Sequence, residues 1–592
     1  MARRNTYKED EILETPFELK HLLRASVYVK KYAGKMVFAL ILSAIGGIMG
    51  LFSPKLTQMA LDGAIPEGNV KKLLTLAGLL VLTFVIAVIF TTIRSRIMIN
   101  VSQSIIYDIR KDVFEHLQKL SFQYYDDRPH GKILIRVVNY VNSVSDMLSN
   151  GLINVVLESM NLIFIVVFML LMDVKLSLVV LAGVPVLMVF LLWIKNKQRK
   201  AWQMVSNKNS NLNAYLQENI VGARITQIFA REEENAKTFE YLSDNCRKTW
   251  MHALRYNNLV WPGIDSISVC VRASIFFFGL VVFGANTSLG VIYAISSYAS
   301  RFWQPIMSLG NIFNNFLNNI AYLERIFETL DEPVKVQDEE GATEMPPIRG
   351  RVEFEHVDFS YEVGKPVLKD LSFTVEPGES VALVGPTGAG KSTIVNLISR
   401  FYNLNGGRVL IDGQDISKVT LKSLRSQMGI MLQDSFIFSG TIEDNIRYGK
   451  LDATEEEIRK ASEIVCADEF IQRFPDAYKT EVKERGSLLS QGQKQLISFA
   501  RTLLSDPAIL VLDEATSSID VQTERALQQG LNAMLQGRTS FIIAHRLSTI
   551  KNCDKIMYVD QGGIVECGTH QELMARKGYY YRLYTAQMED IA

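Results

Sequence analysis

Long apolar runs before residue 320 constrain the fold of this chain more than any other feature. The stretch 73–93 contains no charged residue at all. Each run is long enough, or nearly so, to cross a hydrocarbon core of ~30 Å as a helix. A single run could be a buried helix of a soluble protein, but so many in succession predict a membrane domain. The runs lie near residues 36–57, 73–93, 148–172, 176–194, 259–283 and 289–312.

The charges of the connecting segments predict the orientation of these six spans. Lysine and arginine are abundant before the first run and in the segments 94–147 and 195–258, and are sparse in the other connections. Basic loops stay in the cytoplasm, so we expect both termini there, in a multi-pass protein of the cytoplasmic membrane. The inner segments have helical periodicity and predict long helices that project into the cytoplasm. The segment 16–33 is typical of an interfacial helix.

Composition argues against several classes of function. Lysine plus arginine and aspartate plus glutamate each number 63, so no excess charge indicates a nucleic-acid partner. The five cysteines form no Cys-x-x-Cys pair, which argues against a disulfide scaffold and a structural zinc site.

The chain divides into two parts of different character. Residues 1–330 are expected to form the membrane domain, with the interfacial helix and six helical spans. Residues 331–347 are acidic, contain three prolines and predict an exposed linker. Residues 348–592 alternate short strand-like runs with helical stretches, which predicts a soluble α/β domain.

A glycine-rich loop in the second part predicts a nucleotide site. The strand-like run SVALVG leads into a G-x-x-x-x-G-K-[ST] motif, and a helical stretch follows. Glycines let backbone amides surround a polyphosphate, Lys391 reaches its β- and γ-phosphates, and the hydroxyl of Ser392 suits Mg²⁺. The candidate ATP-binding residues of this loop are Gly385, Pro386, Thr387, Gly388, Ala389, Gly390, Lys391, Ser392 and Thr393.

A second motif supplies two carboxylates. The apolar run before Asp513 and Glu514 predicts a buried strand that carries both residues at its carboxyl end. Open α/β sheets bind their ligands at that edge. Asp513 is suited to bind Mg²⁺, and Glu514 is suited to polarise the attacking water.

In these motifs, residues 348–584 resemble the nucleotide-binding domain of an ABC transporter, and the whole chain resembles a bacterial half-transporter of the exporter type. The discriminating motif is LSQGQ, close to the family signature, in which Ser490, Gln491, Gly492 and Gln493 would contact ATP. The resemblance implies an α/β P-loop fold with a RecA-like core and a helical subdomain.

The resemblance also implies roles for single residues, and we expect each at its matching position. Tyr361 would stack on adenine, Gln433 would sense Mg²⁺, Asp520 lies in the D-loop, and His545 would be the switch histidine. Segments similar to the family's two intracellular coupling segments begin at Leu120 and Glu218, and the stretch 480–486 resembles the exporter-specific loop. The stretch 136–140 departs from the family pattern, which has an acidic residue at or near Tyr140.

Charges inside the spans leave two interpretations open. Glu158, Asp265, Arg272 and Arg301 lie in apolar runs, where a charge costs about 2.5–3.5 kcal/mol or more. Asp265 and Arg272 are seven residues apart and so share a helical face. The four residues belong either to structural ion pairs or to a polar substrate cavity.

The resulting hypothesis is ATP-driven export of a drug, lipid or peptide-like substrate by alternating access. In the family two chains enclose two ATP, so a second half-transporter is required. The altered signature at Gln491 beside an intact Glu514 favours a heterodimer over a homodimer. An importer built on the exporter fold and a soluble ABC-type ATPase acting on nucleic acid are the alternatives.

Overall fold

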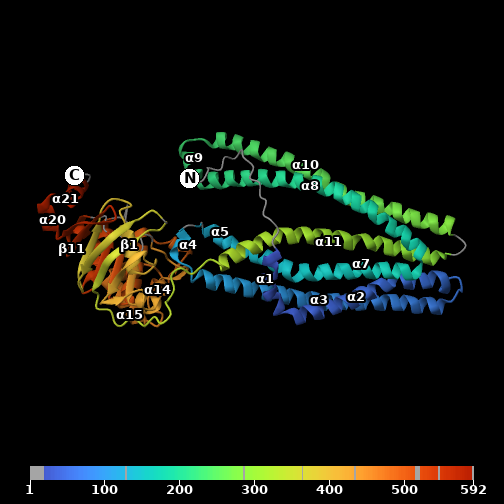
Figure 1. Cartoon of the computed structure of the whole chain (residues 1–592), viewed down its shortest axis with the longest axis horizontal. Helices are drawn as coiled ribbons and strands as arrows, with labels where there is room; N and C mark the ends of the chain where they lie inside the picture. The colour runs from blue at the N-terminus through green and yellow to red at the C-terminus, as the bar shows by residue number, and fades with distance from the viewer. Residues whose placement is uncertain are drawn as a thin grey trace. The chain divides into compact units, whose positions relative to one another are not determined.

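The computed structural model describes residues 19–126, 128, 130–283, 287–362, 364–431, 435–513, 521–543 and 547–589. The chain forms two compact units (Figure 1). The first comprises Met1–Gln118 and Pro129–Glu332. The second comprises Lys119–Arg128 and Pro333–Ala592, so a short segment from the first half of the chain belongs to the second unit.

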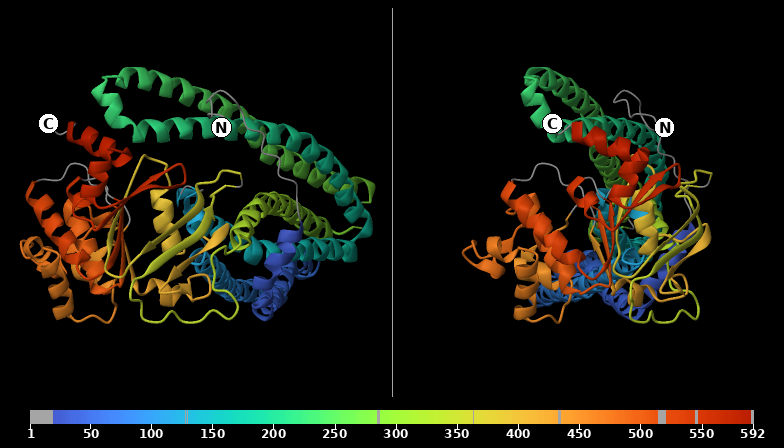
Figure 2. Two further views of the ribbon diagram at one scale, coloured as in Figure 1. Left: turned by 60° about the vertical axis from the view of Figure 1, so that its left-hand side comes forward. Right: turned by 90° about the vertical axis from the view of Figure 1, so that its left-hand side faces the viewer.

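The first unit consists of helices, several of them far longer than the apolar runs they contain. They are α1 (Leu19–Lys30), α2 (Ala33–Met59), α3 (Val70–Leu117), α5 (His130–Ile135), α6 (Val141–Asp146), α7 (Leu152–Met172), α8 (Val174–Val221), α9 (Ala223–Ile228), α10 (Glu232–Phe277) and α11 (Leu289–Leu330), with π-helical turns η1 (Ala60–Ala64), η2 (Arg136–Tyr140), η3 (Met147–Gly151) and η4 (Phe278–Val282). The expected interfacial helix corresponds to α1. The long α8 and α10 run side by side and are joined by α9 at their tip (Figures 1 and 2).

Five helical stretches of the described residues are long and apolar enough to cross a membrane, one fewer than the six predicted spans. They are Ala33–Ala64, Val70–Leu117, Gly131–Met172, Val174–Val221 and Glu232–Val282. The sixth run lies in α11, and a row of polar residues lowers its hydropathy. Arg301, Gln304, Asn311 and Asn315 are exposed at successive spacings of three, seven and four residues, and the exposed Ser300 adjoins Arg301, so these residues share one helical face.

Two hydrogen bonds join α11 to α2 beside a proline. Pro54 has no amide hydrogen, so the carbonyl of Gly50, four residues earlier, lacks its usual helical donor. Arg301 Nη1 donates to this oxygen at 2.8 Å, and the buried Tyr298 hydroxyl donates to the carbonyl of Leu51 at 2.6 Å. Arg301 therefore has a structural role in the helix pair.

The other charges of the spans do not form the pair that their spacing suggested. Seven residues correspond to about 10 Å along a helix, too far for a direct contact between Asp265 and Arg272. Asp265 is exposed, and within the described part of the chain the buried Arg272 Nε has no hydrogen-bond partner. Tyr140, at or near which the family pattern has an acidic residue, stacks on Tyr322 with ring centroids 4.6 Å apart.

The described residues of the second unit form three sheets. One has the order β2-β1-β4-β5, and the central sheet has the order β12-β11-β3-β10-β9-β6, in which only β12 is antiparallel to its neighbour. The strands are β1 (Val352–Phe359), β2 (Leu368–Val375), β3 (Ser380–Val384), β4 (Gly406–Ile411), β5 (Gln414–Asp415), β6 (Met428–Met431), β7 (Gly440–Thr441), β8 (Glu481–Val482), β9 (Ile509–Asp513), β10 (Thr539–Ile543), β11 (Lys555–Asp560) and β12 (Gly563–Gly568), and β7 pairs with β8.

Apolar residues cover both faces of the central sheet. In β3, Val381 and Leu383 belong to one core cluster, and Ala382 and Val384 belong to another. Both faces are buried, so the strands read as continuous apolar runs. The helices of this unit are α4 (Phe122–Asp126), α12 (Lys391–Ile398), α13 (Leu421–Arg425), α14 (Ile442–Arg447), α15 (Glu455–Ile464), α16 (Asp468–Ile471), α17 (Gln491–Leu504), α18 (Val521–Leu535), α19 (Leu547–Lys551), α20 (His570–Arg576) and α21 (Tyr579–Glu589).

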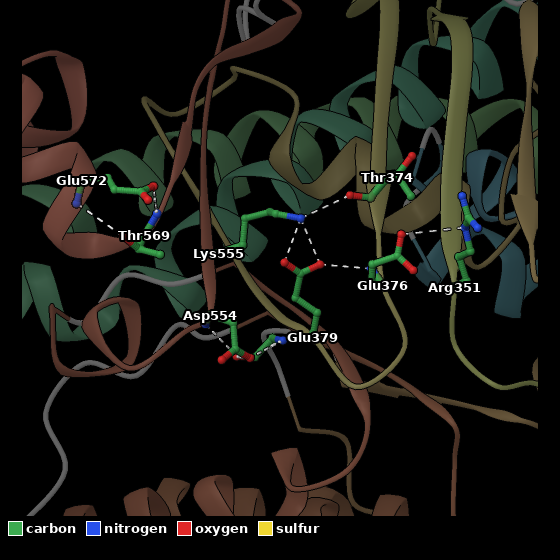
Figure 3. A network of polar contacts seen from close by, with 9 residues as sticks. Arg351, Thr374, Glu376, Glu379, Asp554, Lys555, Thr569 and Glu572 are labelled. Atoms are coloured by element: carbon green, nitrogen blue, oxygen red, sulfur yellow. Dashed lines mark hydrogen bonds and ion pairs between the residues drawn. The ribbon is translucent and has the colours of Figure 1, made fainter.

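A polar network joins the starts of β3 and β11 (Figure 3). Asp554 accepts hydrogen bonds from the Ser380 amide at 2.9 Å and from its hydroxyl at 2.7 Å. Lys555 forms an ion pair with Glu379 at 2.7 Å, and both side chains are largely shielded from solvent. The network holds two adjacent parallel strands in register at the end opposite to the glycine-rich loop.

The predicted linker is mostly exposed but is attached to the second unit. Val336 and Met345 are its buried side chains. Arg400 Nη2 donates to the carbonyl of Gln337 at 3.1 Å, and the amide of Leu421 donates to Asp338 at 2.7 Å. The segment therefore follows the surface of the unit from Pro333 onward.

Candidate nucleotide site

The glycine-rich loop connects β3 to α12 as the motif predicts. Gly385 has φ +143°, and a Cβ there would lie 2.1 Å from the carbonyl oxygen of Val559. Gly390 precedes α12 in a left-handed conformation, with φ +105°, and a Cβ there would lie 2.9 Å from Leu368. Both positions therefore require glycine, and they aim the loop amides and the first turn of α12 at one place.

Lys391 is the one charged residue in the sequence of the loop, and it is buried. Its side chain is almost fully enclosed, and Nζ donates to the carbonyls of Gly385 at 2.8 Å and Pro386 at 2.9 Å. Burial lowers the pKa of Lys391, and the nearby charge of Asp513 acts in the opposite direction. The ammonium group is thus held inside the loop by oxygen atoms, as expected for a group that binds phosphate.

The parallel strands β3, β6, β9, β10 and β11 end at the edge that carries the loop. Asp513 at the end of β9 pairs in register with Ile543 at the end of β10, which in turn pairs with Leu383 of β3. Met431 ends β6 beside Leu512. Asp513 is therefore where the sequence predicts it. Gln433, Glu514, Asp520 and His545 lie outside the described residues. In the sequence Glu514 directly follows β9, and Gln433 and His545 are the second residues after β6 and β10.

The predicted adenine-stacking residue borders the same helix. The hydroxyl of Tyr361 and Oγ1 of Thr393, in the first turn of α12, are 3.1 Å apart and share a hydrogen bond. The ring packs edge-on against Phe359 and Tyr402, with centroid distances of 4.8 Å and 5.0 Å. The side chain remains 37% exposed, so an aromatic base could stack on it.

The signature motif forms the start of α17. Ser490 caps this helix, with its hydroxyl accepting from the amide of Gln493 and the Gln493 side chain accepting from the amide of Ser490. Gln491 is the first residue of α17 and is exposed, whereas Gly492 is buried. The first turn of a helix carries backbone amides and the positive end of the helix dipole, which suit an anion.

The chemistry of two side chains fits a divalent cation. Ser392 presents an exposed hydroxyl beside the loop, and Asp513 supplies one carboxylate close enough to influence Lys391. Magnesium prefers oxygen ligands and takes few protein groups when phosphates and water complete its shell. Within the described ranges no cluster of three or more histidine, cysteine or acidic residues could hold a metal ion.

The structure adds residues that the motifs do not reveal. Tyr402 packs against Tyr361, and its hydroxyl donates to Asp126 of α4 at 2.9 Å. Gln123 Nε2 reaches the carbonyl of Tyr361 at 3.4 Å. An aromatic residue shortly after the phosphate helix is a weak sequence signal for this arrangement. No sequence pattern indicates its partner, because Tyr402 and Asp126 are 276 positions apart.

A phosphate loop, an acidic strand end and a helix-capping signature on one α/β unit define a nucleotide-hydrolysing P-loop ATPase, which long apolar helices attach to a membrane. The family model of the ABC transporter transmembrane region matches residues 36–306, and the ABC transporter model matches residues 368–517.

Relatives over nearly the full length agree. An uncharacterised ABC transporter ATP-binding protein of Bacillus subtilis, YknV, is 40% identical over 584 residues, which are 98% of this chain and 97% of YknV. YheH, a probable multidrug resistance ABC transporter ATP-binding/permease protein of B. subtilis, is 41% identical over 490 residues, 82% of this chain and 72% of YheH.

A solved structure, described as a bacterial Atm1-family ABC exporter with ATP bound, matches with a TM-score of 0.77 at 29% identity, covering 94% of this chain and 98% of that one. The chain belongs to the ABC transporter family. It is an ATP-binding, ATP-hydrolysing membrane transporter of the exporter type, which confirms the family and the activity that the motifs predicted.

Proposed function

We propose that this chain is one half of a dimeric exporter in which ATP closes two nucleotide sites and drives alternating access. The shared edge of β3, β6, β9 and β10 carries the proposal, because it brings Lys391 and Asp513 together at the start of α12. The chain has one phosphate loop and one signature, so each complete site needs two chains.

Each group at this edge is assigned one role. Lys391 and the loop amides bind the β- and γ-phosphates, and Tyr361 stacks on adenine. Ser392, Asp513 and Gln433 would hold Mg²⁺, which neutralises phosphate charge when bound. Glu514 polarises the attacking water, and His545 contacts the γ-phosphate. Residues 490–493 complete the site of the partner chain, and Asp520 lies at that junction.

We place α11 in the membrane as the sixth span, with both termini in the cytoplasm. Polar residues at bilayer depth face protein or water, because lipid offers them no hydrogen bonds. The exposed face from Ser300 to Asn315 therefore lines a water-filled pathway or the partner chain. This assignment supports the cavity interpretation for part of α11, while the bond from Arg301 to Gly50 is structural.

Exposed apolar side chains on both units support the dimer. Ile225, Ile228 and Phe229, at and beside α9, are 59–68% exposed. Phe436, Phe438 and Tyr448 of the second unit are 54%, 43% and 59% exposed, and their rings pack on one another. Contiguous exposed apolar groups mark protein contacts. A second half-transporter is the occupant we assign, and Gln491 favours a different chain over a second copy.

The proposed substrate is a drug, lipid or peptide-like molecule. A drug is supported by the name of YheH, a probable multidrug resistance transporter. The polar face of α11 is compatible with an amphipathic molecule. A siderophore-like importer on the same fold is the alternative. The balanced charge gives no support for a nucleic-acid partner.

Transport in vesicles of known orientation tests the proposal. We expect ATP-dependent accumulation of fluorescent amphiphiles inside inverted membrane vesicles that contain this chain and its partner. Glu514→Gln should retain ATP binding and abolish accumulation. Accumulation only in right-side-out vesicles loaded with ATP would establish an importer. Near-normal ATPase activity of the Glu514→Gln transporter would exclude Glu514 as the residue that activates water.

A further inference from the structure

The short helix α4 is attached to the nucleotide unit by a small set of side chains. It lies between α3 and α5 in the chain, yet it belongs to the compact unit that contains the nucleotide site. Phe122 packs on Phe401 with ring centroids 4.3 Å apart. Gln123 accepts a 2.8 Å hydrogen bond from Lys335, and Asp126 accepts a 2.9 Å hydrogen bond from the hydroxyl of Tyr402.

Tyr402 packs on the ring of Tyr361, the residue assigned to stack on adenine, whereas Gln123 of α4 reaches only the main-chain carbonyl of Tyr361, at 3.4 Å. The Tyr402 ring is perpendicular to that of Tyr361 at a centroid distance of 5.0 Å, and it packs against Phe359 at 5.8 Å. It follows α12 closely, and α12 begins with Lys391. The rigid side chain of Tyr402 therefore packs its ring against Tyr361 and bonds its hydroxyl to Asp126 of α4.

We propose that Tyr402 is a positioning residue through which α4 responds to adenine bound on Tyr361. An adenine ring stacked on Tyr361 limits the orientations open to that side chain, and Tyr402 is in van der Waals contact with it. Because the Tyr402 hydroxyl is bonded to Asp126, the change reaches α4 and thereby the helices α3 and α5 that flank it. The bond between Tyr402 and Asp126 thus couples nucleotide binding to the membrane helices.

Two variants separate the ring of Tyr402 from its hydroxyl. Tyr402→Phe keeps the packing on Tyr361 and removes the bond to Asp126, and Asp126→Ala removes the same bond from the other side. Both should leave the KM for ATP within about twofold of wild type, because the ring that supports Tyr361 remains. Both should reduce transported substrate per ATP at least fivefold. Tyr402→Leu removes the ring as well, and should also raise the KM several-fold.

Hydrogen–deuterium exchange of the assembled transporter in lipid nanodiscs gives a readout besides activity. Adding a non-hydrolysable ATP analogue should slow amide exchange in residues 119–128 of the wild type. Tyr402→Phe and Asp126→Ala should lose at least half of this ATP-dependent slowing. The matched control is Lys335→Ala, which removes another attachment of α4. It should speed exchange with and without nucleotide and preserve the ATP-dependent difference.

Because this inference rests on the proposed function, analogue binding is measured first in every protein. A wild-type transporter that binds no analogue would remove the proposed function itself. If the wild type binds and responds, the inference is overturned by a Tyr402→Phe transporter that keeps the full ATP-dependent difference. It is equally overturned if Lys335→Ala loses that difference to the same extent, or if Tyr402→Phe raises the KM as much as Tyr361→Ala does. The inference is supported if Tyr402→Phe and Asp126→Ala lose the ATP-dependent difference in amide exchange while Lys335→Ala keeps it.

Discussion

Arg301 of α11 donates a hydrogen bond to the carbonyl oxygen of Gly50, which lacks its usual helical donor because residue 54 is a proline. Arg301→Leu should therefore destabilise the helix pair by about 1 kcal/mol, the usual scale for such bonds in membrane proteins. Pro54→Ala restores the missing amide donor. In the Pro54→Ala background, Arg301→Leu should consequently reduce the stability of the helix pair much less.

The four proteins of this double-mutant cycle can be compared by thermal unfolding in one detergent. A loss of thermal stability on Arg301→Leu that is smaller in the Pro54→Ala background would confirm the structural role of the arginine. Equal losses in both backgrounds would show that Arg301 acts elsewhere, for example on a substrate. Arg301→Lys is a useful control, because it retains the charge and a donor but lacks the planar guanidinium.

Tyr361 should determine how tightly ATP binds but hardly how fast it is hydrolysed. Stacking acts almost equally on the ground state and the transition state, so its loss raises KM more than it lowers kcat. Base stacking on an aromatic side chain is worth roughly 1–3 kcal/mol, so we expect Tyr361→Ala to raise the KM about tenfold. Tyr361→Trp should stay near wild type. An unchanged KM in Tyr361→Ala would remove this residue from the site.

Binding of ATP should weaken at alkaline pH because of Lys391. Burial lowers the pKa of this lysine in the free protein, whereas the phosphates of ATP favour the charged form and raise it in the complex. ATP binding then takes up a proton between the two pKa values. The affinity for ATP should fall as the pH rises through the pKa of Lys391 in the free protein. This pKa lies below the ordinary lysine value of 10.5.

The measurement is the Kd of a fluorescent ATP analogue between about pH 7 and 10, with Mg²⁺ left out. Lys391→Arg is the matched control, because a guanidinium group stays charged throughout this range. Its Kd, weaker or not, should depend little on pH. The same slope in both proteins would assign the titration to another group.

The sequence predicted local elements well, because their signals are local. The apolar runs locate α2, α3, α7, α8 and α10, and the helical period of the inner segments predicted that α3, α8 and α10 continue far beyond the apolar runs. The G-x-x-x-x-G-K-[ST] motif predicted the turn between β3 and α12 because its glycines are required by φ and by close backbone contact. The run in α11 was less clear, since the polar residues on one face of this helix lower its hydropathy.

Partners distant in the sequence could not be predicted in the same way. The partner of Arg301 is a backbone carbonyl 251 positions away, and the feature that exposes it is a proline in another helix. Asp265 and Arg272 share a helical face, but a spacing of seven residues separates them too widely for an ion pair. The attachment of α4 to Tyr402 depends on how elements of the second unit pack, which no periodicity encodes.

The last prediction concerns Gln491 and the identity of the partner chain. Gln491 is the first residue of α17 and is exposed, and the cap formed by Ser490 fixes the start of the helix around it. The family signature has glycine at this position, where backbone amides face a phosphate of the partner's nucleotide. A glutamine side chain has to turn away or occupy part of that space, so the site it completes should hydrolyse ATP slowly.

Glu514 is intact in the same chain, so the site built on its own phosphate loop should be active when a partner supplies an orthodox signature. We therefore expect the chain purified alone to have low ATPase activity and to gain activity with a distinct half-transporter. In that pair, Glu514→Gln here should stop turnover, whereas the equivalent change in the partner should matter far less. Gln491→Gly should raise the activity of the chain alone severalfold, because it clears the amides of the α17 start. A stable, fully active homodimer that transports substrate, and in which Gln491→Gly changes nothing, would establish a symmetric transporter instead.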